Sequence, residues 1–116
     1  SSLVDLKRYA EAKSLLRKSI PVARRVLGEN DELTLKMRHN YAVTLYKAEG
    51  ATVDDLREAV GTLEALAPTA RRVLGSAHPT TTGINRALRA SREALSAHDG
   101  VSAIREMVAA TTLGDA

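Results

Sequence analysis

The chain has no cysteine, phenylalanine or tryptophan, and tyrosine occurs only three times. The absence of cysteine excludes disulfide frameworks, zinc–thiolate sites and thiol catalysis. Scarce aromatic side chains argue against binding of single-stranded nucleic acid, because proteins that bind it stack the bases on aromatic rings. Apolar runs are only a few residues long, far short of the ~20 residues that span a bilayer, and no signal-peptide pattern is present. We therefore expect a soluble, cytoplasmic protein with no membrane partner.

Charged side chains are abundant, and the two signs are nearly balanced. Lysine and arginine number 17 against 14 aspartates and glutamates, which gives a net charge of +3 at pH 7. This weak basic bias suits an acidic partner but falls short of the charge of a nucleic-acid-binding domain. The three histidines do not cluster in the sequence, and neither a nucleophile elbow nor a glycine-rich phosphate loop occurs. We expect no metal, no cofactor and no enzymatic activity.

An internal repeat organises the chain. The hexapeptide Ala-Arg-Arg-Val-Leu-Gly occurs at Ala23–Gly28 and again at Ala70–Gly75, 47 residues later. Half of the residues in 9–28 recur at the same offset in 56–75. Because chance does not reproduce so much over such a stretch, the two segments are copies of one structural unit. The predicted organisation is a single domain with a partial repeat at 1–28, a repeat at 29–75, and a repeat or C-terminal cap at 76–116.

The repeat has helical periodicity, and no stretch alternates as a strand would. In the first copy, apolar residues recur every three or four positions and form one stripe of Tyr9, Ala12, Leu16, Ile20, Ala23 and Leu27. We expect a partial helix at Leu3–Leu6, then helices at Tyr9–Leu27, Glu32–Glu49, Val53–Leu74, Pro79–Ala97 and Gly100–Leu113. The boundary signals are C-terminal glycines at Gly28 and Gly75 and N-caps at Asp31, Thr52 and Asp99.

Two prolines at equivalent positions, Pro21 and Pro68, fall inside predicted helices. A proline inside a helix removes one backbone hydrogen bond and clashes with the preceding turn. Because the proline recurs at one register, we favour a tolerated kink in each helix. The alternative interpretation is that each helix breaks at its proline.

The junction between the copies resembles that of a known repeat family. Residues 27–42 read Leu-Gly-Glu-Asn-Asp-Glu-Leu-Thr-Leu and then, after three residues, His-Asn-Tyr-Ala, and the second copy has His78-Pro79 in its turn. This order is similar to the junction between kinesin-light-chain repeats, a subtype of the tetratricopeptide repeat. Leu6–Ala12 resembles the hairpin loop that opens the second helix of such a repeat. The resemblance covers about residues 3–97 and implies an all-α, right-handed superhelix of about two and a half helical hairpins.

The resemblance also implies a binding surface. Tetratricopeptide superhelices bind extended peptides on a concave face lined by the first helix of each hairpin, and the residues placed on or near it are Lys36, His39, Asn40, Val43, Tyr46 and Arg86. Lys36 and Asn40 are four residues apart and point the same way. They align with positions that some tetratricopeptide domains use to bind a carboxylate, and an ammonium with an amide donor can orient an anion. The implied partner is a protein or peptide, acidic in character.

Other interpretations stay open at this point. The equivalents of Lys36 and Asn40 in the next copy are Gly83 and Ala87, so the pair can also be a solvated lysine beside a packing asparagine. A repeat of 47 residues also suits HEAT or armadillo folds. The alternative functions are a nucleic-acid-binding helical repeat and a fragment of a larger helical enzyme.

The first residues resemble the end of a helix whose body is absent. Solenoid repeats bury their apolar faces only against neighbours, so an end without a neighbour stays exposed. We expect exposure of Leu3, Val4, Leu6 and part of the stripe of Tyr9 and Leu16. The expected consequence is weak self-association through the N-terminal helix.

Overall fold

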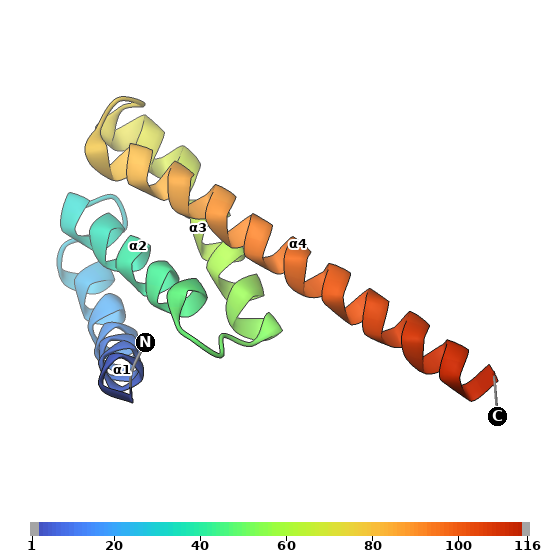
Figure 1. Ribbon diagram of the computed structural model, residues 1–116. Coiled ribbons are helices and arrows are strands. Elements are labelled where there is room, and N and C mark those ends of the chain that lie inside the picture. The colour runs from blue at the N-terminus through green and yellow to red at the C-terminus, as the bar shows by residue number, and fades with distance from the viewer. Residues whose placement is uncertain (1–2, 115–116) are drawn as a thin grey trace.

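The computed structural model describes residues 3–114, which form four α-helices and no strand. In chain order these are α1 (Leu3–Val26), α2 (Glu32–Lys47), α3 (Val53–Leu74) and α4 (Pro79–Gly114), as Figure 1 shows. The connections are short, so each helix packs against its neighbour in the sequence. The predicted all-α, tetratricopeptide-like helical repeat fold is confirmed.

The predicted boundary signals act as expected at the middle helices. The Asp31 carboxylate accepts a hydrogen bond from the Leu33 N–H at 2.9 Å and caps α2. Thr52 and Asp55 exchange side-chain and backbone hydrogen bonds in a capping box at the start of α3. Gly28 and Gly75 have φ values of 97° and 96°, which glycine adopts without the steric cost of a Cβ. Asp31 and Thr52 thus explain where α2 and α3 begin, and the two glycines follow the C-terminal ends of α1 and α3.

Both end helices are longer than predicted. Lys7 and Arg8 favour helix, so the expected boundary between Leu6 and Tyr9 is absent and α1 is continuous. Asp99 does not cap a new helix, because α4 runs through Gly100 as one helix of 36 residues. A single glycine costs a helix only about 1 kcal/mol relative to alanine, and helix formers surround this one. The expected separate helices Pro79–Ala97 and Gly100–Leu113 were therefore wrong.

The helices also pass through both internal prolines. Pro21 lies inside α1 and Pro68 inside α3. The interpretation that each helix breaks at its proline was wrong, and the kink stays a prediction. Each proline is exposed, and each leaves one carbonyl of the preceding turn without an intrahelical donor.

The two copies make the same buried hydrogen bond. The Thr34 hydroxyl donates to the Ala23 carbonyl at 3.5 Å, and the Thr81 hydroxyl donates to the Ala70 carbonyl at 3.2 Å. Both threonine side chains are fully buried. The donor and the acceptor are each displaced by the repeat offset of 47 residues, so the repeat in the sequence is a repeat in packing.

The hydrophobic core lies where the helices contact one another, and the second half of α4 lies outside it. Its buried members are Ile20, Leu35, Tyr41, Ala42, Leu45, Ala59, Leu63, Leu66, Ala70, Ile84, Ala87 and Leu88. α3 packs against both α2 and α4, whereas the second half of α4 projects away from the other helices (Figure 1). The molecule is consequently elongated, with extents of 61 × 31 × 24 Å. Within residues 3–114, no helix combines the length and the apolar character needed to cross a membrane.

Candidate functional site

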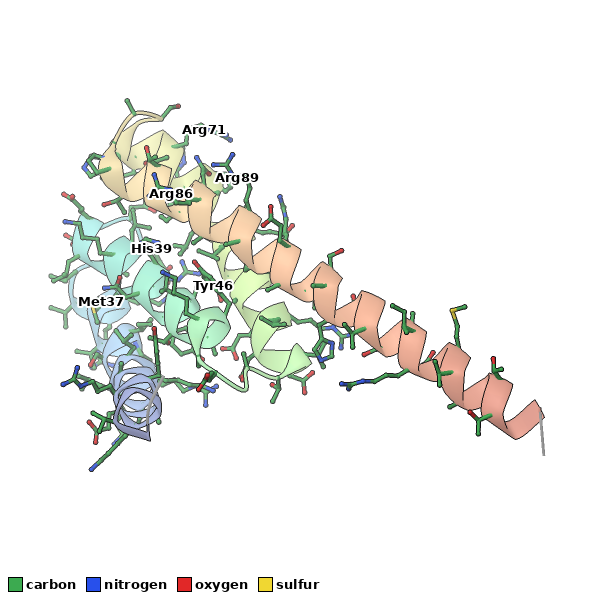
Figure 2. The ribbon with its side chains drawn as sticks, viewed as in Figure 1. Met37, His39, Tyr46, Arg71, Arg86 and Arg89 are labelled. Carbon is green, nitrogen blue, oxygen red and sulfur yellow. The ribbon has the colours of Figure 1, made fainter. Side chains whose placement is uncertain are left out.

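The candidate binding surface is formed where α2 and α4 lie side by side. A shallow hollow opens between them, lined by Glu32, Lys36, His39, Asn40, His78, Pro79 and Thr80. Figure 2 shows His39 and Tyr46 on α2 and Arg86 on α4. We call the hollow together with Arg86 the α2–α4 surface.

Glu32 links the two helices at the α2–α4 surface. Its carboxylate lies 3.4 Å from Lys36 Nζ, one turn away on α2, and 3.3 Å from His78 Nε2. His78 Nδ1 accepts a hydrogen bond from the Thr80 N–H at 3.1 Å and thereby caps α4. Because Nδ1 accepts, the neutral ring carries its proton on Nε2, which faces Glu32. One carboxylate thus holds a lysine of α2 and the capping histidine of α4.

His39 packs against α4 at Gly83. Its ring is half-buried and lies against Gly83, where a Cβ would come within 3.1 Å of His39 Cε1. Burial lowers the pKa of His39, and a hydrogen bond with the Gly83 backbone partly opposes that shift. The ring is therefore neutral at pH 7 and acts as a packing group at this position.

The structure brings only part of the predicted site together. Lys36, His39 and Asn40 line the hollow, with Lys36 and Asn40 exposed side by side on α2. Val43 and Tyr46 instead pack partly buried against the core, and this burial raises the pKa of Tyr46. Arg86 is exposed on α4 outside the lining of the hollow.

Sequence reasoning missed the roles of Glu32 and His78. Glu32 stands four residues before Lys36, a spacing that predicts an ion pair on a helix. His78 occupies the repeat position of Asp31, 47 residues later, and both side chains accept a hydrogen bond from the backbone N–H two residues on. The repeat offset was therefore the signal that would have identified His78 as a cap.

A polar cluster on the other side of α2 ties α1 to α3. Arg17 Nε donates to the Tyr41 hydroxyl at 2.8 Å, and that hydroxyl donates to a Glu58 oxygen at 2.6 Å. Arg17 also lies 3.6 Å from the second Glu58 oxygen. Burial and the bond to Glu58 raise the pKa of Tyr41. Further along these helices, Lys13 pairs with Asp55 at 3.3 Å. Each charge in this cluster has a partner, which is typical of a structural contact.

Comparisons with known proteins support the fold but name no partner. The family model described as tetratricopeptide repeat matches residues 1–32. The match supports a tetratricopeptide repeat in this chain. Repeats of this type are typically non-catalytic scaffolds for protein–protein interaction. No curated protein and no solved structure matches the chain.

Proposed function

We propose that this protein binds a peptide segment of a partner protein along the α2–α4 surface and has no catalytic activity. The observation that carries the proposal is the pair of neighbouring helices, each the first of its hairpin, that present exposed donors at Lys36, Asn40 and Arg86. In the tetratricopeptide architecture, extended peptides bind along such a row of first helices. The kinesin-light-chain subtype, the repeat division at residues 1–28, 29–75 and 76–116, and a cytoplasmic location belong to the same proposal.

The charges at the α2–α4 surface favour an acidic peptide. Lys36 pairs with Glu32, but about half of each side chain is exposed, and exposed pairs of this spacing contribute only about 0.3–0.5 kcal/mol. A ligand carboxylate can replace Glu32 at little cost. Arg86 has no ion-pair partner within residues 3–114, so its charge is available to the ligand. Asn40 adds an exposed amide donor beside Lys36.

A peptide-display selection tests this proposal. We expect the selected peptides to be rich in aspartate and glutamate, and Lys36→Glu to weaken their binding more than tenfold, about 1.4 kcal/mol. Lys18→Glu is the matched control, because Lys18 is an exposed lysine of α1 away from the α2–α4 surface. Equal affinity of wild type and Lys36→Glu, or cross-links from the peptide to α1 and α3, would show that the surface is not the binding site.

We also propose weak self-association through α1. Val4 and Leu15 are 60% and 65% exposed, and Val22 lies on the same side of the helix. Tyr9 and Leu16 are only partly exposed, and the side chains of Leu3 and Leu6 lie outside the described residues. Light scattering over a concentration series measures the effect, and Leu15→Glu should reduce it. A monomer at every concentration would contradict the proposal.

A further inference from the structure

A second hollow opens between α1, α2 and α3, away from the α2–α4 surface. It is lined by Arg17, Ile20, Pro21, Arg24, Arg38, Tyr41, Glu58 and Thr62. Arg38 is two residues from both Lys36 and Asn40, which places it about 200° around the helix from each of them. The two hollows therefore lie on opposite sides of α2. We call this second one the arginine hollow.

Two arginines of the hollow share a single carboxylate. Arg24 Nε lies 3.1 Å from Glu29 Oε1, and Arg38 Nη1 lies 3.8 Å from Glu29 Oε2. Only 16% of the Arg38 side chain is exposed, and its burial and the nearby charge of Arg24 lower the pKa of Arg38. Within the described residues, this mostly buried guanidinium therefore has an ion-pair partner only at 3.8 Å. This end of the hollow has two positive charges and one negative charge.

The position of Glu29 shows that these two arginines bind a carboxylate. Each of its carboxylate oxygens faces one guanidinium, an arrangement that suits the planar donors of arginine. Glu29 lies in the turn between α1 and α2, and 60% of its side chain is exposed. A side chain so placed can move into water without disturbing a helix. The Glu29 carboxylate can therefore be replaced by another anion.

The opposite end of the hollow offers no such opening. There Arg17, Tyr41 and Glu58 satisfy one another. Between the two ends lie the apolar side chains of Ile20 and Pro21, which suit the methylene groups of a bound acidic side chain.

We propose that the arginine hollow is a second binding site, which takes the carboxylate of a glutamate or aspartate side chain from a partner protein in place of Glu29. The site lies apart from the α2–α4 surface, so the two binding proposals can be tested independently of each other. Glu29 acts as an internal competitor for this site. Removing its charge should therefore tighten the binding of an external carboxylate.

Titration with glutarate, followed through the NMR signals of the arginine side-chain Nε–Hε groups at constant ionic strength, tests the proposal. We expect Glu29→Gln to tighten glutarate binding about threefold, the effect of losing a partly exposed ion pair. Arg24→Gln should abolish the saturable shift of the Arg38 signal, and Arg38→Gln that of Arg24. Glu64→Gln is the matched control, because it removes the charge of a similarly exposed glutamate that pairs with Arg92 away from both hollows. It should leave the glutarate shifts of the Arg24 and Arg38 signals unchanged.

Three results would overturn the proposal. The first is that Glu29→Gln binds glutarate no more tightly than wild type. The second is an unchanged glutarate affinity in Arg24→Gln, a variant of an exposed residue that we expect to fold. The third is that inorganic phosphate binds the hollow more tightly than glutarate at equal ionic strength, which would assign the site to a phosphate group instead of a carboxylate.

Discussion

α1 and α3 contain two copies of one sequence, but they are buried to different extents. Leu63 and Ala59 of α3 are fully buried, whereas their equivalents Leu16 and Ala12 in α1 are partly exposed. α3 packs against both α2 and α4, while α1 packs against α2 and is linked to α3 by the ion pairs Lys13–Asp55 and Arg17–Glu58. The same residues therefore stabilise the two helices unequally. In a linear array, the neighbours of a repeat determine how much its apolar face contributes.

The largest effect that we expect comes from equivalent leucines. Leu63→Ala should lower the free energy of unfolding by about 2–5 kcal/mol, because it opens a cavity in a fully enclosed site. Leu16→Ala should cost clearly less, because the side chain is already partly in water. Urea unfolding followed by circular dichroism measures both. Equal losses of unfolding free energy in the two variants would contradict the unequal contribution of these leucines to α1 and α3.

Two glycine-to-alanine variants compare the contact between α2 and α4 with an open helix surface. Gly61 in α3 has no atom within 4 Å of an added Cβ, so Gly61→Ala should stabilise the protein by about 0.5–1 kcal/mol. Gly83→Ala makes the same change in helix propensity but pushes on the His39 ring. We expect Gly83→Ala to give no gain, or a net loss of up to about 1 kcal/mol. Thermal unfolding of both variants decides the point, and an equal gain in both would show that the His39 contact is loose.

The smallest expected effect is a pH dependence at the contact between α2 and α4. The pKa of His39 is lowered in the folded protein relative to 6.5 in an unfolded chain. As the pH falls below 6.5, the unfolded chain takes up the proton first, so stability that is present above that pH is progressively lost. His39→Gln should therefore weaken the loss of stability between neutral and mildly acid pH.

Urea unfolding of wild type and His39→Gln at a series of pH values measures this effect. The same slope in His39→Gln as in wild type would mean that His39 does not contribute.

Local signals in the sequence predicted the middle of the fold well. Asp31, Thr52 and Gly75 mark helix ends through bonds within a few residues, and such bonds need no tertiary information. The sequence did not predict that α4 is one continuous helix, because Gly100 after Asp99 looks like a helix start. A penalty of about 1 kcal/mol at one glycine cannot by itself decide between a break and a continuous helix.

The candidate sites were harder to predict than the helices. The spacing of Lys36 and Asn40 placed both on one side of α2, and that placement holds in the structure. The arginine hollow could not be foreseen, because it depends on Arg24, Glu29 and Arg38 meeting from two helices and the turn between them. Their sequence separations follow no helical spacing that would have brought them together. The contact depends on how α1 packs against α2.

Amide hydrogen exchange, measured with and without a selected acidic peptide, tests the binding proposal most directly. We expect α3 to be better protected than α1 in the free protein, because α3 packs against two neighbouring helices and α1 against one. Added peptide should increase protection in α2 and in the first half of α4, near Lys36, Asn40 and Arg86, and leave α1 unchanged. Increased protection confined to α1, with α2 and α4 unaffected, would contradict binding at the α2–α4 surface.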